Sequence, residues 1–217
     1  MKKPLVFVLL FPDVELLDFA GPLEVFSVAR DGEGERLFDV VAVAPPRPRS
    51  IGATTGVGAI AAADQLRARH GLAIAAEMTV DDAAPGGAAP AFLVVPGGYG
   101  IRALLEDVAL LEFLRRCHAS GTTVASVCTG AWLLARAGLL EGREATTHHL
   151  CLERLKELAP SCVIRPDRRV IDCGSVITSG GISAGIDMAL HLVATRFGHD
   201  RAVAAAEYME YRWDGRA

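Results

Sequence analysis

The sequence predicts an α/β fold with a doubly wound, mostly parallel β-sheet that carries helices on both faces. Short apolar runs rich in β-branched residues alternate with segments of helical periodicity along nearly the whole chain, which is typical of a parallel sheet covered by helices. Three of these runs lead into turns followed by helices, so the turns can converge on one crevice. The chain has 217 residues and shows no linker or repeat, so we expect a single domain over residues 1–217.

Apolar runs bounded by turn residues predict strands at Leu5–Phe11, Phe38–Ala44, Phe92–Val95, Thr122–Val127 and Val176–Ser179. Two crossover helices are expected between them, in GPLEVFSVAR, with Pro22 near its first turn, and in LLEDVALLEFLRRCHAS. A further helix has apolar residues at three- and four-residue steps from Ile186 to Phe197 and ends at Gly198. This alternation predicts a flavodoxin-like arrangement.

The stretch from Pro45 to Asp82 fits no single element. PPRPRS is typical of a loop, whereas the alanine-rich GVGAIAAADQ is compatible with a strand or a helix. The segment APGGAAP, from Ala84 to Pro90, is expected to form a surface loop before the next strand.

Charge and hydropathy exclude several classes of partner. The net charge is −4 and the basic residues are scattered, so no nucleic acid is expected to bind. The apolar run Leu5–Phe11 lacks a cleavage site and is soon followed by Asp13, so we interpret it as a buried strand and not a signal peptide. No apolar run approaches the roughly 18 residues that a membrane span requires, and no membrane partner is expected.

The chain contains five cysteines, an odd number, and none forms a Cys-x-x-Cys pair: they are Cys117, Cys128, Cys151, Cys162 and Cys173. This pattern suits a reducing compartment, so we expect a cytoplasmic location. Most of these thiols should be packing residues, because free cysteine is commonly buried.

Cys128 is the strongest candidate for a nucleophile. In VASVCTGAWLL it lies at a strand-to-helix turn, where backbone N–H groups and the helix dipole should lower the pKa of its thiol. Ser126 and Gly130, two positions to either side, are small enough for the sharp turn of a nucleophile elbow. The alternative is a buried cysteine at a tight helix start.

Two further turns can contribute to the same crevice. Gly97 and Gly98 directly follow a buried strand, and their N–H groups could stabilise an oxyanion, although Gly-Gly is more often a plain turn. Asp18 could be a helix N-cap or a solvated loop residue. Beside a thiol in a partly apolar crevice its pKa should rise, which would suit it to proton transfer. Glu24 is the competing acid.

The pair His148-His149 suggests a metal site only weakly. Adjacent histidines on a helix point in different directions, and no further ligand lies at zinc-type spacing, so no metal is expected. One of the two, His148, is expected to line the substrate pocket.

Four segments together resemble the ThiJ/PfpI superfamily: LLDFAGPLEVF, VVPGGYG, SVCTGAWLLARAGLLEGREATTHH and TSGGISAGIDMALHLV. They span nearly the whole chain, and the resemblance implies the class I glutamine amidotransferase-like fold. Within the superfamily, LDFAGP and the Cys-Thr-Gly elbow are most similar to isonitrile hydratases and to the ligand domains of amidase-like transcriptional regulators.

The resemblance implies roles for individual residues. Cys128 matches the hydratase nucleophile, Asp18 the acid/base carboxylate and Thr129 the residue after the nucleophile, while Gly97 and Gly98 match the oxyanion-side turn. Members described as proteases carry His directly after the cysteine, and glutaminases use a late His-x-Glu, and neither feature is present here. Peptidase and glutaminase activities are therefore not expected.

The implied reaction is hydration of an isonitrile to an N-substituted formamide, by thiolate addition, a thioimidate and attack of water. It needs no cofactor, and a small electrophile is the expected substrate. The resemblance also implies a homodimer.

Two alternatives remain at this point. One is a ligand-sensing domain without turnover, although the related regulators carry a helix-turn-helix region, and only about one helix and a tail follow AGIDMALHLV here. The other is a glyoxalase or deglycase activity, which would use Glu24 in place of Asp18.

Overall fold

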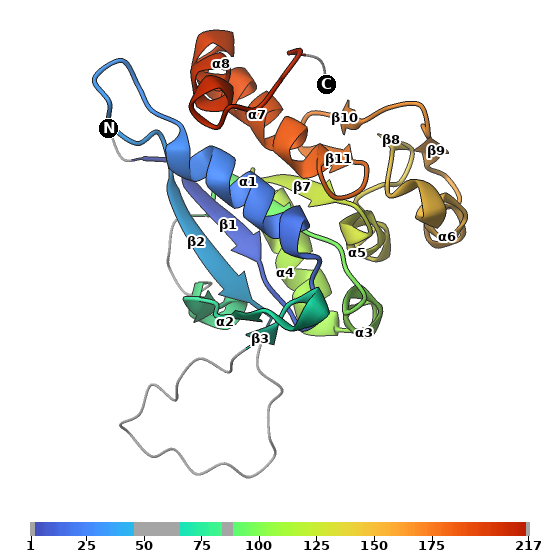
Figure 1. Ribbon diagram of the computed structural model, residues 1–217. Coiled ribbons are helices and arrows are strands. Elements are labelled where there is room, and N and C mark those ends of the chain that lie inside the picture. The colour runs from blue at the N-terminus through green and yellow to red at the C-terminus, as the bar shows by residue number, and fades with distance from the viewer. Residues whose placement is uncertain (1–2, 46–65, 84–88, 216–217) are drawn as a thin grey trace, which may run out of the picture.

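A seven-stranded sheet forms the centre of the computed structural model, which describes residues 3–45, 66–83 and 89–215 (Figure 1). The spatial strand order is β10-β11-β7-β6-β1-β2-β5, and all pairs are parallel except β10 with β11. In chain order the strands are β1 (Leu5–Leu9), β2 (Asp39–Ala44), β5 (Met78–Thr79), β6 (Phe92–Val95), β7 (Thr123–Val127), β10 (Val170–Asp172) and β11 (Val176–Ser179). The predicted fold class is confirmed.

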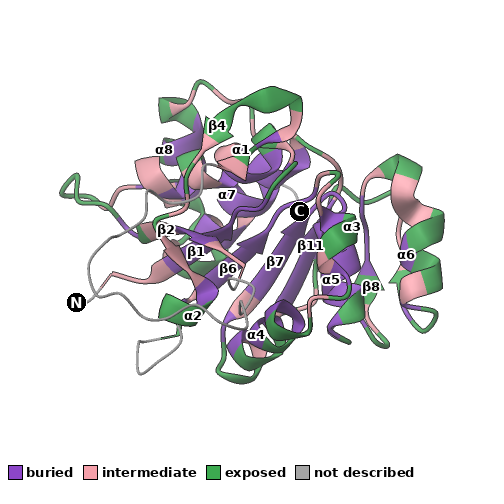
Figure 2. Ribbon diagram, turned by 90° about the horizontal axis from the view of Figure 1, so that it is seen from below, coloured by how far each residue is buried: buried purple, intermediate pink, exposed green. Residues whose placement is uncertain are grey.

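Helices cover both faces of this sheet (Figures 1 and 2). On one face α1 (Leu16–Val28), α7 (Ala184–Phe197) and α8 (His199–Tyr208) pack together, and α4 (Val108–Ala119) lies on the other. The shorter helices are α2 (Val80–Ala83), α3 (Ile101–Leu104), α5 (Gly130–Arg136), α6 (Leu152–Leu158) and the 3₁₀ turns η1 (Arg69–Gly71) and η2 (His149–Cys151). Two small ribbons pair β3 (Leu66–Arg67) with β4 (Ala73–Ile74) and β8 (Glu144–Ala145) with β9 (Val163–Ile164).

The central strands are buried on both faces, which explains why their sequences are continuous apolar runs. Val6 and Val8 of β1 and Leu93 and Val94 of β6 are fully buried. Burying one such side chain stabilises the fold by about 1.5–3 kcal/mol. The five predicted strands are all present, with ends that differ by at most two residues.

The differences from the predicted elements have local causes. The edge strands β5 and β10 were not predicted, because two or three residues show no periodicity. Helix α1 begins at Leu16, so Pro22 lies inside it and not near its first turn. The predicted helix end at Gly198 is confirmed, because Gly198 caps α7 with a φ of 95°, a value that favours glycine. GVGAIAAADQ, most of PPRPRS and residues 84–88 lie outside the described residues.

The chain reverses its direction of strand addition between β1 and β6. From β1 the sheet grows through β2 to β5, and from β6 it grows the other way through β7 to β11. Ligands of open α/β sheets bind outside the carboxyl ends of the strands at such a switch point. The loops that follow β1, β6, β7 and β11 therefore meet at one place.

Candidate active site

Cys128 lies at a strained turn between β7 and α5. Its φ is 57°, in the left-handed region that non-glycine residues seldom adopt. Its N–H donates to the carbonyls of Ser179 and Gly180 at 3.2 and 3.0 Å, and its carbonyl accepts from Thr147 Oγ1 at 2.6 Å. These contacts hold the strained conformation, which has the geometry of a nucleophile elbow.

Small residues on either side permit this turn. A Cβ on Gly130 would collide with the carbonyl oxygen of Val95, so only glycine fits where α5 begins. Ser126 is fully buried in β7, between the neighbouring strands β6 and β11. The structure therefore explains the small residue at Gly130, whereas the need for a small residue at Ser126 stays a prediction.

Asp18 lies in the first turn of α1 and is fully buried. Its Oδ2 accepts the Gly97 N–H at 3.0 Å, which ties α1 to the turn after β6. Its Oδ1 is buried without a partner of good hydrogen-bond geometry among the described residues. The two ordinary explanations from sequence, an N-cap and a solvated loop residue, are therefore wrong: Glu15 occupies the N-cap position, and Asp18 points inward.

Burial raises the pKa of Asp18 from 3.8 to about 7. The hydrogen bond from Gly97 lowers it, the nearby charge of Glu15 raises it, and interactions with the Cys128 thiol and the Ile182 N–H lower it. The expected rise is confirmed. A carboxyl group with this pKa can both take and give a proton near neutral pH.

The expectation of a lowered pKa for Cys128 is wrong. Burial, and then the charge of Asp18, raise the pKa of the thiol far above its ordinary value, although the Thr129 N–H lowers it. Only one short helix starts at this turn, and its dipole does not offset desolvation. The Asp18 carboxyl group therefore loses its proton at a lower pH than the Cys128 thiol does.

The N–H groups of Gly97 and Gly98 are already used inside the site. Gly97 donates to Asp18, and Gly98 donates to Thr129 Oγ1 at 3.0 Å. In this arrangement they position the acid and the elbow, and the predicted pair of free oxyanion donors is not seen. Glycine is required at both positions: a Cβ on Gly97 would lie 2.6 Å from Thr129 N, and Gly98 has a φ of 134°.

Glu24 is exposed on α1 and does not line the cavity at Cys128. Glu24 is six residues after Asp18, so the two side chains point about 120° apart around the axis of the helix. Because Asp18 points inward, Glu24 turns outward. The structure therefore does not bring the competing acid to the thiol.

His148 does line the cavity. Its Nδ1 accepts the Leu150 N–H at 3.2 Å, so the proton of the neutral ring lies on Nε2. The ring stacks on His149 at 4.4 Å between centroids and lies so close to Gly181 that a Cβ there would collide with it. Burial, and then His149, lower the pKa of His148, which keeps the ring neutral at neutral pH.

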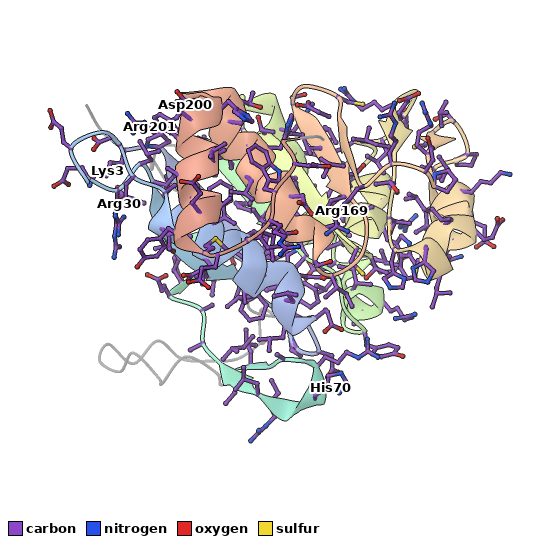
Figure 3. All side chains as sticks on the ribbon, turned by 45° about the horizontal axis from the view of Figure 1, so that its top comes forward. Lys3, Arg30, His70, Arg169, Asp200 and Arg201 are labelled. Atoms are coloured by element: carbon purple, nitrogen blue, oxygen red, sulfur yellow. The ribbon has the colours of Figure 1, made fainter. Side chains whose placement is uncertain are left out.

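The cavity at Cys128, here called the Cys128 pocket, has a volume of about 450 Å³. Besides Cys128, Thr129, Gly98 and His148, its wall contains Glu15, Arg69, Tyr99, Arg102, Leu150, Cys151 and Ile182. The sequence interpretation did not assign these seven residues to the site. Tyr99 and Arg102 lie just after the Gly97-Gly98 turn, so the strand-end argument could have been extended to them. Arg69 lies in η1, the turn that joins β3 to β4, where Figure 3 labels its neighbour His70.

Two further findings concern metals and membranes. Within residues 3–45, 66–83 and 89–215, no group of three or more His, Cys, Asp or Glu side chains could hold a metal ion. No helix in the same ranges is long and apolar enough to cross a membrane.

A cysteine at a strained turn, next to a buried carboxyl group at the switch point of a mostly parallel sheet, places the chain in the class of doubly wound α/β proteins. The model of the DJ-1/PfpI family matches residues 4–195, and the chain belongs to this family. The resemblance seen in the sequence is thereby confirmed.

Similar proteins in this family include enzymes and regulators. Isonitrile hydratase from Pseudomonas putida is 34% identical over 206 residues, which cover 94% of this chain and 76% of that protein. The HTH-type transcriptional regulator GbdR from Pseudomonas aeruginosa is 34% identical over 151 residues, which cover 68% of this chain and 38% of the regulator. The crystal structure of a ThiJ/PfpI family protein from Pseudomonas syringae has a TM-score of 0.76 at 26% identity, and the match covers 99% of this chain and 77% of that one.

Proposed function

We propose that this protein hydrates a small isonitrile to the corresponding N-substituted formamide, with Cys128 as nucleophile and Asp18 as the acid and base. The observation that carries the proposal is the buried Asp18 carboxyl group. Its pKa is near 7, and Oδ2 accepts a hydrogen bond from the Gly97 N–H. Oδ1 is buried and has no partner of good hydrogen-bond geometry among the described residues. The similarity to isonitrile hydratase supports the choice of reaction.

The first half of the reaction joins the sulfur to the substrate. Asp18 as carboxylate accepts the proton of the Cys128 thiol, and the sulfur attacks the terminal carbon of the isonitrile. Asp18 then returns the proton to that carbon, which gives a thioimidate, R–N=CH–S–Cys128. This proton relay explains how a thiol with a raised pKa reacts, because the base lies beside it.

The second half adds water. Asp18 takes a proton from water as the water oxygen attacks the thioimidate carbon, and it then gives this proton to the nitrogen, which yields R–NH–CH(OH)–S–Cys128. The C–S bond then breaks, the hydroxyl proton of the adduct passes through Asp18 to the sulfur, and R–NH–CHO leaves. The sum is one isonitrile and one water converted to one formamide, and no leaving amine has to be protonated.

The alternative reactions are less well supported by the geometry. A glyoxalase or deglycase activity that used Glu24 is not favoured, because Glu24 is exposed outside the Cys128 pocket. A ligand sensor remains the second candidate, since a transcriptional regulator is among the relatives. Turnover separates the two, because a sensor binds the isonitrile without consuming it.

An infrared assay that follows loss of the isonitrile stretch tests the proposed function. The wild type should consume alkyl or aryl isonitriles, Cys128→Ser should not, and glutamine and peptides should not react. Consumption of methylglyoxal without loss of isonitrile would overturn the proposal.

We also propose that the protein is a cytoplasmic homodimer. Large apolar side chains are exposed at the Cys128 pocket, where Leu150 is 80% and Ile182 37% exposed, and next to it, where Leu16 is 38% exposed. Pairing with a second copy would cover them. A monomer in light scattering at micromolar concentration would contradict the dimer.

A further inference from the structure

Two arginines at the Cys128 pocket, Arg69 and Arg102, differ in whether they form an ion pair. Arg69 Nη1 donates to Glu15 Oε2 at 3.0 Å, which forms an ion pair. Arg102 has no carboxylate or carbonyl oxygen at hydrogen-bond distance in the part of the chain that the structure describes. Among the described residues, no acidic side chain forms an ion pair with Arg102, in contrast to Arg69.

Aromatic rings hold Arg102 without using its N–H groups. Its guanidinium carbon lies 5.2 Å from the centre of the Tyr99 ring and 5.3 Å from that of Trp132. The Trp132 ring is only 4% exposed, so it is a fixed support. A cation–π contact leaves the donors in the guanidinium plane available, and the guanidinium fork matches a carboxylate.

The other charged groups of the pocket do not oppose a bound anion strongly. Glu15 is neutralised by Arg69, which itself lies 4.2 Å from the Tyr99 ring centre. His148 is uncharged at neutral pH because burial lowers its pKa. The carboxyl group of Asp18 is fully buried behind the elbow, next to the thiol.

We propose that Arg102 is a specificity-determining residue that binds a carboxylate of the substrate, so that the molecule attacked by Cys128 is a small electrophile with a carboxylate group. This inference rests on the proposed function for the reaction and on the Arg102 contacts for the anion. A cavity of about 450 Å³ accepts a molecule of this size.

Binding of a matched pair of unreactive ligands tests the subsite without any chemistry at sulfur. Cyclohexanecarboxylate and cyclohexanecarboxamide have the same shape and differ in charge. In calorimetric titrations the wild type should bind the carboxylate more tightly. Arg102→Gln should weaken carboxylate binding about fivefold, as expected for a partly exposed ion pair, and change amide binding less than about twofold.

Arg116→Gln is the matched control, because Arg116 is an exposed arginine on α4 that is paired with Glu112 and does not line the pocket. It should leave both affinities unchanged. Equal affinity of the wild type for the two ligands, no binding of the carboxylate, or an equal loss for both ligands in Arg102→Gln would overturn the inference.

Turnover of a second pair, isocyanoacetate and its methyl ester, separates this inference from the proposed function. Isocyanoacetate should be the better substrate, and Arg102→Gln should raise its KM about fivefold with little change in kcat. If neither isonitrile reacts while the carboxylate preference holds in binding, hydration fails and the subsite stands. If both react equally well and Arg102→Gln has no effect, the subsite fails and hydration stands.

Discussion

Asp18 and Asp187 occupy equivalent places on neighbouring helices but have opposite surroundings. Each lies in the first turn of its helix, α1 or α7, and these helices pack against each other. Both carboxyl groups are buried, and both gain from the partial positive charge of a helix start. Position on a helix therefore does not distinguish them.

The hydrogen-bond partners of the Asp18 and Asp187 carboxyl groups distinguish the two residues. Asp187 accepts from Arg169 Nε at 2.5 Å and from the Tyr211 hydroxyl at 3.1 and 3.2 Å, so its charge is fully compensated; Arg169 is labelled in Figure 3. Asp18 has one backbone donor on Oδ2 and a thiol beside it, and none of the described residues forms an ion pair with it. The contrast predicts that the Asp187 carboxylate stabilises the fold, whereas the Asp18 carboxylate destabilises it and can exchange a proton near neutral pH.

The largest expected effect is on stability at alkaline pH. The pKa of Asp18 is raised in the folded state, so the folded protein binds this proton more tightly than the unfolded chain does. Its contribution to stability is fully present below about pH 4 and is lost as the pH rises to about 7. Asp18→Asn should therefore be more stable than the wild type at pH 8, by about 4 kcal/mol.

Urea unfolding at several pH values measures this difference, which should shrink as the pH falls towards 4. Glu24→Gln, on the exposed side of the same helix, is the control and should show no such trend. If Asp18→Asn is no more stable than the wild type at pH 8, Asp18 does not ionise at a cost.

The second effect is on turnover. Asp18→Asn should lower kcat by at least about a hundredfold, the usual scale for loss of a general acid–base group, while Asp187→Asn should keep most of the activity. The infrared assay measures both. A more damaging Glu24→Gln would instead favour the deglycase-like reaction.

The third effect is on the stability of a variant at the other carboxylate, Asp187, and it has the opposite sign to the effect of Asp18→Asn. Asp187→Asn removes the charge opposite Arg169 and weakens the bond from Tyr211, so unfolding should become easier by about 2 kcal/mol. The loss is at the low end for a buried pair because the Arg169 side chain is 50% exposed and can regain water. Thermal unfolding checks it, and Arg168→Gln is a control at a more exposed arginine.

The sequence predicts the fold well because continuous apolar runs and helical periodicity are local signals. It also predicts Cys128 and Asp18 as neighbours, since both follow parallel strands whose carboxyl ends meet at one edge. It does not predict that Glu24 points away from the thiol. The sequence places the start of α1 near Pro22, and without the correct start it cannot be assigned which side chains of the helix face the sheet.

Other features depend on contacts between distant segments. The raised pKa of Cys128 comes from burial among several elements and from Asp18, which no local pattern shows. The contact of Arg102 with Trp132 joins α3 to α5, and Arg69 reaches the pocket from a ribbon of two-residue strands. Such contacts arise only when the whole chain is folded.

The smallest effect, counted for one pH unit, is on the pH dependence of the reaction, and it tests the Asp18–Cys128 pair directly. The proposed mechanism requires Asp18 as carboxylate while Cys128 keeps its proton, and the pKa of Asp18 is about 7. Below that pH the carboxyl group is protonated and cannot accept the thiol proton, so kcat/KM should rise about tenfold per pH unit up to about pH 7 and then level off. Asp187→Asn should keep this profile, whereas the residual activity of Asp18→Asn should lack the inflection near 7. A wild-type profile that is flat from pH 5 to 8 would mean that the thiol reacts without Asp18, and the contrast between the two carboxylates would then concern stability alone.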